Sequence, residues 1–257
     1  MKQDVLTQHF SLQGRTGIVT GASSGIGRGI AHLLADAGAR VFNFSLEATQ
    51  TTGIDYALNP GVVDIQVDIT DREQLQAAVD RVAADGAIDF LINNAGITKR
   101  VRAEQVDEAW WRKIHQINVD AVFFLSQLCF PHLTRSAYIG RIVNISSMAA
   151  HLGFSEVVPY CSTKAAVTGM TRGLAVEWAQ ENIRVNSVAP GWIQTNMTQV
   201  VADPQRLERI INRMPLHRYG HPREELGAMV WFLVSEASRY ITGQDFAVDG
   251  GALSYGF

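Results

Sequence analysis

The stretch Thr20-Gly21-Ala22-Ser23-Ser24-Gly25-Ile26-Gly27 decides the fold. It follows a short β-branched run and precedes an amphipathic segment, which is typical of a glycine-rich turn from a strand into a helix. Its glycines let the backbone turn tightly and let a pyrophosphate approach the free N–H groups and positive dipole end of the helix. Because the spacing is G-x-x-x-G-x-G rather than G-x-G-x-x-G, the stretch alone also fits a turn that binds nothing.

Short, nearly continuous apolar runs alternate with longer amphipathic segments along the rest of the chain. Such runs are typical of strands buried on both faces, and their alternation with helices predicts right-handed crossovers. We expect an α/β, single-domain Rossmann fold with a doubly wound seven-stranded parallel sheet and helices on both faces. The expected strands are 17–20, 40–44, 62–67, 89–93, 140–145, 184–189 and 245–248. The expected helices are 27–37, 72–85, 106–133, 160–181 and 224–234, with Asp71, Asp107 and Pro222 near three of the starts.

Residues 1–257 form one dinucleotide-binding and catalytic domain in this interpretation, because no linker or internal repeat divides the chain. The segment 194–218 breaks the alternation, with two prolines and an amphipathic piece around 206–213. We place a substrate flap at about 194–215, over the carboxyl edge of the sheet, where ligands bind in such folds.

Composition excludes several classes of function. The 257 residues are 47% hydrophobic and 18% charged with a net charge of −3, which leaves no electrostatic footprint for nucleic acid or an anionic membrane. The first residues lack the apolar core of a signal peptide, and the apolar runs are far shorter than the roughly 20 residues that span a bilayer. Two cysteines, Cys129 and Cys161, offer neither a disulfide framework nor a multi-cysteine metal site. We expect a cytoplasmic protein with a small-molecule substrate and no metal, nucleic-acid or membrane partner.

Further motifs follow the glycine turn in a fixed order. They are Asn93-Asn94-Ala95-Gly96 after the fourth expected strand, Asn118, Ser146-Ser147, Tyr160-Cys161-Ser162-Thr163-Lys164 and Pro190-Gly191-Trp192-Ile193-Gln194-Thr195. With them, the sequence resembles the short-chain dehydrogenases/reductases over essentially the whole chain. The resemblance implies an NAD(P)-dependent oxidoreductase that transfers hydride between nicotinamide and a secondary alcohol or ketone.

The catalytic prediction starts from Tyr160 and Lys164, which lie four residues apart on one face of an expected helix. A nearby ammonium favours the phenolate of a tyrosine, and such a pair suits acid–base chemistry at a substrate oxygen. Ser147 can hydrogen-bond the same oxygen; Ser146 is the alternative, and the family spacing favours Ser147. The resemblance implies that Lys164 also binds the nicotinamide ribose and that Asn118 anchors a water chain to it. The predicted catalytic residues are Asn118, Ser147, Tyr160 and Lys164.

The resemblance also assigns cofactor contacts along the carboxyl edge of the sheet. Asp68 would accept a hydrogen bond from the adenine amino group, although it also fits a helix-capping role for which Asp71 is better placed. The predicted cofactor-binding residues are Gly21, Ser23, Ser24, Gly25, Ile26, Gly27, Ser45, Asp68, Ile69, Asn94, Ala95, Gly96, Tyr160, Lys164, Pro190, Gly191, Ile193 and Thr195.

The residue at the end of the second strand normally selects between the two nicotinamide cofactors. An acid there binds a ribose 2′-hydroxyl, whereas an arginine binds a 2′-phosphate. This chain has Ser45 at that position, no base at Ser24, and Glu47, which would repel a phosphate. We predict NAD(H) as the cofactor, with NADP(H) as the alternative.

The substrate prediction rests on a closer resemblance. The sequence is similar to the branch acting on sugar acids, which includes gluconate 5-dehydrogenases and 2-dehydro-3-deoxy-gluconate 5-dehydrogenases. The similar stretches are Val122-Phe123-Phe124-Leu125-Ser126-Gln127, Glu177-Trp178-Ala179, Pro190-Gly191-Trp192 and Thr195-Asn196-Met197-Thr198-Gln199. Lys99, Arg100 and Arg102 would suit a carboxylate, although each also fits a solvated loop. The predicted substrate-binding residues are Ser147, Tyr160, Arg100 and Trp192, with His151, Leu152, Phe154 and Val158 lining the pocket.

Alternative functions come from inside and outside this branch. Within the family, a β-ketoacyl-carrier-protein reductase or a polyol or ketose reductase shares most of the motifs. A non-catalytic dinucleotide-binding regulator has the same fold, but such regulators typically lose the serine, tyrosine and lysine that this chain retains.

A homotetramer is the expected assembly. The expected helices 106–133 and 160–181 carry apolar residues on more than one side, which predicts that they are covered on every side. Relatives pack these two helices into subunit interfaces and use the tail 252–257 in another.

Overall fold

Seven strands build one parallel sheet in the order β3-β2-β1-β4-β5-β6-β7. The computed structural model describes residues 2–84, 86–195 and 204–255. Every predicted strand is present, with each end within one residue of the prediction, which confirms the α/β doubly wound fold. The strands are β1 (Thr16–Thr20), β2 (Arg40–Ser45), β3 (Val62–Gln66), β4 (Phe90–Asn93), β5 (Gly140–Ile145), β6 (Ile183–Pro190) and β7 (Asp245–Val248).

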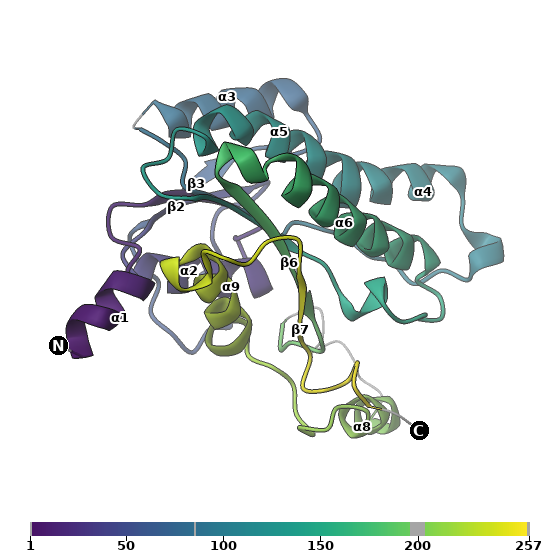
Figure 1. Ribbon diagram of the computed structural model, residues 1–257. Coiled ribbons are helices and arrows are strands. Elements are labelled where there is room, and N and C mark those ends of the chain that lie inside the picture. Colours follow the sequence, from purple (N-terminus) through teal and green to yellow (C-terminus); the bar gives the residue numbers. More distant parts are fainter. Residues whose placement is uncertain (1, 85, 196–203, 256–257) are drawn as a thin grey trace.

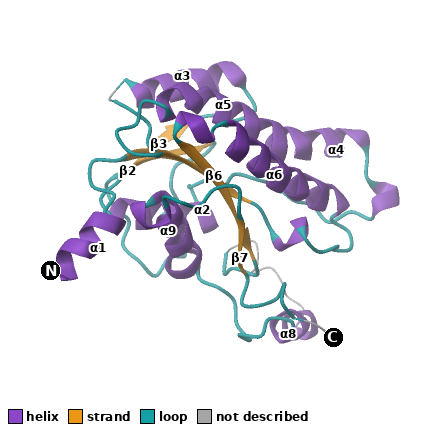
Figure 2. Cartoon of the chain, in the orientation of Figure 1, coloured by secondary structure: helices purple, strands orange, loops and turns teal. Residues whose placement is uncertain are grey.

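Helices cover both faces of the sheet (Figure 1). One face packs against α2 (Gly25–Asp36) and α9 (Ala228–Val234), whereas the other packs against α3 (Arg72–Ala83), α5 (Ala121–Leu133) and α6 (Val158–Glu177). Alternate residues of a strand point to opposite faces, so nearly every strand position is buried and the strands have the continuous apolar sequence that predicted them. Figure 2 shows the sheet as the middle layer between the two sets of helices.

The predicted helix 106–133 is three elements in the structure. It begins as α4 (Glu108–His115), widens into a π-helix, η2 (Gln116–Asp120), and continues as α5. Asp107 caps α4, because its Oδ1 accepts a hydrogen bond of 2.7 Å from the backbone N–H of Trp110. Apolar periodicity does not register a π-turn, which adds one residue to a single turn. This turn carries Asn118.

Four other helix predictions were wrong at their ends, and the first of them, 27–37, is α2. The prediction 160–181 is α6, which starts earlier with a proline in its first turn, followed by a 3₁₀ turn, η4 (Ala179–Glu181). The prediction 224–234 is a π-helix, η5 (Pro222–Gly227), followed by α9. The prediction 72–85 ends at Ala83 among the described residues, and position 85 lies outside them.

An amino-terminal helix, α1 (Lys2–Phe10), was not predicted. It is attached to α9 by tertiary contacts. The Trp231 indole donates a hydrogen bond of 2.8 Å to the carbonyl oxygen of Phe10, and the two rings meet edge to face with centroids 5.8 Å apart. A short, mostly polar helix has little intrinsic stability, so sequence periodicity alone did not reveal it.

The predicted flap is only partly described. Residues 196–203 lie outside the described residues, and the amphipathic piece that follows is the helix α8 (Pro204–Asn212). The segment entering the flap is held at its base, where the Gln194 N–H donates a hydrogen bond of 2.8 Å to the Gly220 carbonyl. None of the described helices is both long and apolar enough to span a bilayer.

Candidate active site

The glycine turn joins β1 to α2 at the carboxyl edge of the sheet. Gly21 and Gly25 have φ angles of +67° and +55°, in the left-handed region that favours glycine. A Cβ at Gly27 would lie 2.5 Å from the Gly21 carbonyl oxygen, so the helix starts in close contact with the turn. No side-chain hydrogen bond from Ser24 caps α2. The first-turn N–H groups and the positive dipole end of this helix therefore suit the pyrophosphate of a dinucleotide.

The loop after β4 is tied to this turn. The Thr20 hydroxyl oxygen accepts hydrogen bonds from the backbone N–H groups of Asn94 at 3.0 Å and Ala95 at 2.9 Å. The Asn94 side chain donates back to the Thr20 carbonyl at 2.9 Å. The structure thus brings the predicted residues 94–96 to the glycine turn.

The predicted adenine side lies after β3. Asp68 Oδ1 accepts hydrogen bonds from the backbone N–H and the hydroxyl of Thr70, at 2.9 and 2.7 Å. Asp71, and not Asp68, caps α3 by accepting from two backbone N–H groups of its first turn. The capping alternative for Asp68 is therefore wrong. Ile69, also predicted, packs against the core between the sheet and α3.

The two neighbouring serines after β5 have different partners. Ser147 lies close enough to Tyr160 to lower the pKa of the phenol by hydrogen bonding, and its Oγ accepts from the Ala149 N–H at 3.1 Å. Ser146 instead donates to Asp245 Oδ1 at 2.8 Å and to the Val188 carbonyl at 3.2 Å, toward β6 and β7. The structure therefore brings Ser147 to the tyrosine and directs Ser146 away from it.

Lys164 is buried close to the ring of Tyr160. The lysine is 5% exposed, its Nζ donates a hydrogen bond of 2.7 Å to the Ile145 carbonyl, and the same atom is 5.6 Å from the centroid of the Tyr160 ring. Burial lowers the pKa of Lys164 from 10.5 to about 8.

The pKa of Tyr160 depends mainly on burial in this structure. Burial raises the pKa of Tyr160 above its usual value and outweighs the hydrogen bond from Ser147, which lowers it. The Lys164 Nζ, 5.6 Å from the centroid of the Tyr160 ring, donates its hydrogen bond to the Ile145 carbonyl. Tyr160 is accordingly a neutral phenol at neutral pH, ready to donate a proton.

Asn118 is 1% exposed in the π-turn and bonds across to the loop after β4. Its Oδ1 accepts from the Ile97 N–H at 2.9 Å, while its Nδ2 donates to the Ile97 carbonyl at 3.0 Å and to the Thr163 hydroxyl at 3.2 Å. A Cβ at Gly96 would lie 3.3 Å from Asn118 Oδ1 and 3.7 Å from Lys164 Nζ. The asparagine and the lysine therefore border the same small space.

The segment 190–195 closes the cofactor edge. A Cβ at Gly191 would lie 2.5 Å from the Asp249 Cα, so this position needs glycine. A Cβ at Gly25 would meet the Thr195 side chain at 3.5 Å, which places the end of the segment beside the glycine turn. Ile193 is buried and bridges to Gly220. The glycine turn and the segment 190–195, which are far apart in the sequence, thus meet at the carboxyl edge of the sheet.

Ser45 is buried at the end of β2, close to the glycine turn. Its hydroxyl donates a hydrogen bond of 2.6 Å to Asn43 Oδ1, which also accepts from the Ala22 N–H at 2.9 Å. The carbonyl of Ser23 accepts from the Gln50 N–H at 2.8 Å. Sequence reasoning missed Asn43, although its polar side chain in an otherwise apolar strand was a signal.

The basic loop, residues 99–102, is solvent-exposed and largely neutralised by neighbouring carboxylates. Arg100 pairs with Glu156, which adopts a left-handed φ of +68°, through a 2.9 Å hydrogen bond from Nε. Arg102 Nε lies 2.5 Å from Glu104, and Lys99 Nζ lies 5.8 Å from the centroid of the Trp110 ring. Sequence reasoning missed the two glutamates.

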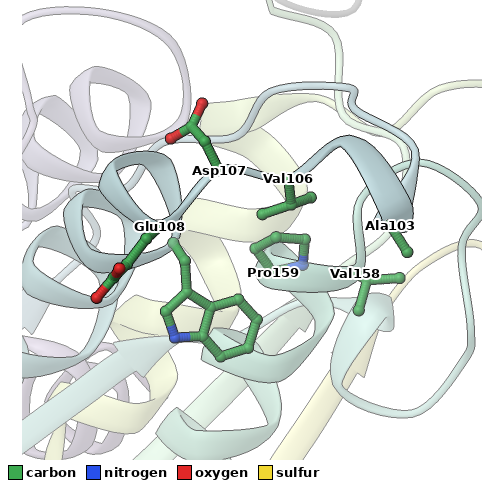
Figure 3. Close-up of a pocket in the computed structure, with 7 residues that line it drawn as sticks. Ala103, Val106, Asp107, Glu108, Val158 and Pro159 are labelled. Atoms are coloured by element: carbon green, nitrogen blue, oxygen red, sulfur yellow. The ribbon is translucent and has the colours of Figure 1, made fainter.

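The predicted substrate-pocket residues divide between two cavities. Trp192 lines a cavity of about 500 Å³ together with residues 214–216 and 247–251. Val158 lines a second cavity of about 330 Å³ between α4 and the start of α6. Figure 3 shows Val106, Val158 and Pro159 facing this second cavity. Val158 and Trp192 thus line different cavities, and their shared role in one substrate pocket stays a prediction. His151 is bonded to Asp245, with 2.6 Å between Nε2 and Oδ2.

Comparisons with known proteins agree with this geometry. The family model described as enoyl-(acyl carrier protein) reductase matches residues 21–252. A 2-dehydro-3-deoxy-D-gluconate 5-dehydrogenase from Escherichia coli is 40% identical over 95% of this chain and 98% of its own length. A 3-oxoacyl-(acyl-carrier-protein) reductase from Thermotoga maritima is 39% identical over 93% and 98%.

A solved structure of a gluconate 5-dehydrogenase from Burkholderia cenocepacia, in complex with NADP and tartrate, superposes with a TM-score of 0.88. It is 32% identical and covers 97% of this chain and 99% of the solved chain. The fold, the edge that carries the glycine turn and these full-length similarities lead to one assignment. The chain belongs to the short-chain dehydrogenase/reductase family and is an NAD(P)-dependent oxidoreductase that acts on CH–OH groups.

Proposed function

We propose that this enzyme interconverts a secondary hydroxyl and a ketone on a sugar acid or keto-sugar, with Tyr160 as the acid and base. The observation that carries the proposal is that Ser147 and the buried Lys164 both lie close to Tyr160, with the Lys164 Nζ 5.6 Å from the centroid of the Tyr160 ring. These three side chains lie beside the loop that is bonded to the glycine turn, at the edge where a nicotinamide dinucleotide would bind. The dinucleotide, when bound, supplies or accepts the hydride.

The proton chemistry is assigned to the chain's own residues. In reduction, the neutral Tyr160 phenol donates its proton to the substrate oxygen, and Ser147 donates a hydrogen bond to the same oxygen as its charge develops. In oxidation the phenol must first lose its proton. Lys164 suits that step, because a pKa of about 8 lets it exchange a proton near neutral pH. Asn118 holds the loop at Ile97 and Gly96 against this lysine.

The choice of cofactor is open to a direct measurement. Ser45 and the exposed Glu47 favour NAD(H), whereas the Burkholderia gluconate 5-dehydrogenase described above was solved with NADP and favours NADP(H). The NAD(H) preference predicted from the sequence therefore lacks support from that relative. Initial rates with both cofactors, at matched substrate concentration, decide between the two.

The sugar-acid substrate is supported by the Escherichia coli and Burkholderia relatives, whose names specify gluconate derivatives. A carrier-protein reductase is the second candidate, because the Thermotoga relative is almost as similar. An acidic carrier protein would need an exposed basic surface, but Arg100 and Arg102 are each paired with a carboxylate. This pairing lowers the positive charge of the loop and favours a small substrate, whose single carboxylate would replace Glu156 at Arg100, beside Lys99.

The test is a panel of substrates read by nicotinamide absorbance. Gluconate, 5-keto-gluconate and 2-dehydro-3-deoxy-gluconate are compared with polyols, ketoses and an acetoacetyl thioester. We expect the highest kcat/KM for a sugar acid. A higher kcat/KM for the thioester would instead establish the carrier-protein reductase, and activity with none of them would contradict both.

A homotetramer is proposed from apolar surface on the outer helices. Trp111, Phe123, Phe124 and Val176 are each more than one-third exposed in the single chain. The expectation that these helices are covered on all sides is therefore not met within one subunit, and a second copy is the occupant that we propose. Sedimentation velocity tests this assembly, and a stable monomer at micromolar concentration would refute it. A cytoplasmic location and the role of residues 194–215 as a substrate flap remain predictions.

A further inference from the structure

A buried polar network joins the end of β2 to β3 and to the glycine turn. Asn43 and Ser45 are two residues apart on β2, so their side chains share one face of the sheet. Asp64 is the register partner of Asn43 on β3, and the Ala22 backbone of the glycine turn lies over Asn43. Asn43 is fully buried, and Ser45 is nearly so. The network therefore lies at the end of β2, where the sequence predicts contact with the ribose 2′-hydroxyl.

The hydrogen bonds of Asn43 determine which end of its amide is the acceptor. Its Oδ1 accepts from the Ala22 N–H at 2.9 Å, and its Nδ2 donates to Asp64 Oδ1 at 2.8 Å. A backbone N–H only donates and an ionised carboxylate only accepts, so a flipped amide would lose both bonds. The Ser45 hydroxyl lies 2.6 Å from the same Oδ1 and must therefore donate its proton to it.

Asp64 remains ionised in this network. Its two oxygens accept from the Thr49 N–H at 2.9 Å and from the Thr49 hydroxyl at 2.6 Å, in addition to Asn43. Burial raises the pKa of Asp64, but the hydrogen bonds from Thr49 and Asn43 outweigh that effect and leave the pKa below its usual value. The carboxylate thus holds the amide of Asn43 in one orientation at neutral pH.

We propose that Asp64 and Asn43 are positioning residues for cofactor choice. They orient the Ser45 hydroxyl so that it donates to Asn43 Oδ1, and only the lone pairs of the Ser45 oxygen remain for the ligand. This inference rests on the proposed dinucleotide site. A ribose 2′-hydroxyl can donate a hydrogen bond to such an oxygen, whereas a 2′-phosphate presents further acceptor oxygens and is repelled. The arrangement selects the unphosphorylated ribose.

Nearby cations do not offset this selection. The stretch 45–53 contains no lysine or arginine, and Glu47 within it is exposed. The guanidinium of Arg28, on α2, donates to the carbonyl oxygens of Gln50 at 2.7 Å, Thr52 at 3.1 Å and Gly53 at 3.3 Å. Arg28 is 5% exposed and its charge is directed at this loop. A 2′-phosphate would therefore meet acceptors and a carboxylate rather than a bidentate arginine.

Equilibrium binding of two probes, ADP-ribose and 2′-phospho-ADP-ribose, tests the inference without any turnover. We expect the wild-type protein to bind ADP-ribose about tenfold more tightly than 2′-phospho-ADP-ribose, because only ADP-ribose can donate a hydrogen bond to the Ser45 oxygen. Asp64→Asn removes the carboxylate that fixes the Asn43 amide, so the Ala22 N–H alone holds the amide and the Asn43 oxygen accepts less firmly from the Ser45 hydroxyl. The dissociation constant of 2′-phospho-ADP-ribose divided by that of ADP-ribose should then fall by about threefold or more. Ser45→Ala should also lower this ratio, mainly because it weakens the binding of ADP-ribose.

Two variants separate this effect from a general loss of structure. Asp71→Asn also changes a carboxylate that accepts backbone hydrogen bonds, but it caps α3 outside the network, so the ratio should not change. Ser146→Ala should likewise leave the ratio unchanged, because the Ser146 hydroxyl bonds to Asp245 and to the Val188 carbonyl, outside the network. A wild-type ratio of one or below, or an unchanged ratio in both Asp64→Asn and Ser45→Ala, would overturn it. If neither probe binds, the proposed dinucleotide site fails together with it.

Discussion

The catalytic centre and the basic loop handle positive charge in opposite ways. Lys164 is buried, bonds to a carbonyl and has a pKa lowered to about 8. Arg100 is 48% exposed on its side chain and is neutralised by Glu156. Burial without a carboxylate makes the protonation of a lysine sensitive to its surroundings, whereas an exposed ion pair contributes little and exchanges partners easily. The difference separates a group suited to moving protons from one suited to holding an anionic ligand.

The largest expected effect comes from removing the acid at the buried centre. Tyr160→Phe should lower kcat by about 10³-fold, because the proton donor is lost while the ring and its packing remain. Dinucleotide binding, measured by fluorescence titration, should stay within about twofold of wild type. Residual activity above a tenth of wild type would show that another group transfers the proton.

Lys164→Met should reduce activity about 100-fold and, at the same time, stabilise the fold. Lowering the pKa from 10.5 to about 8 costs the folded state on the order of 3 kcal/mol while the lysine is charged. Between pH 8 and 10.5 the unfolded chain binds more protons, so the stability of the wild type should rise with pH across this window. The free energy of unfolding in urea should therefore favour the variant most at pH 7 and least near pH 10. An equal difference at both pH values would contradict the lowered pKa.

The two serines provide a matched pair inside the same loop. Ser147→Ala should lower kcat by about 100-fold, because the donor at the substrate oxygen is removed. Ser146→Ala should change kcat by less than about threefold and cost about 1 kcal/mol of stability, since Asp245 and the Val188 carbonyl lose a donor. Steady-state kinetics and urea unfolding measure the two effects. Equal losses of kcat would mean that Ser146 also reaches the substrate.

The smallest effect is expected at the basic loop. Arg100→Ala should raise KM for a sugar acid by about threefold with little change in kcat, because the arginine can exchange Glu156 for a substrate carboxylate. Arg102→Ala is the control, since Arg102 pairs with Glu104 two residues further along the chain. A KM that is the same in both variants and in wild type would remove Arg100 from the substrate site.

Local sequence predicted the strands and the placement of Tyr160 and Lys164 on one helix. A strand buried on both faces has a continuous apolar run, and the glycine turn has a spacing that few other structures require. The prediction of one helix over 106–133 was less accurate. The π-turn at Asn118 accompanies side-chain bonds to Ile97 and Thr163, which apolar periodicity does not reveal. The pairing of Arg100 with Glu156 joins residues far apart in the chain, so the sequence did not show that a carboxylate neutralises this arginine.

The sequence by itself determined the parallel sheet, the turn that would hold a pyrophosphate, and the tyrosine and lysine on one helical face. These features depend on residues close together in the chain, where spacing implies geometry. Only the tertiary structure decided that Ser147 and not Ser146 meets Tyr160, that Tyr160 stays a neutral phenol, and that the Ser45 proton points inward. Each of these depends on burial and on partners contributed by distant strands, which no local spacing specifies.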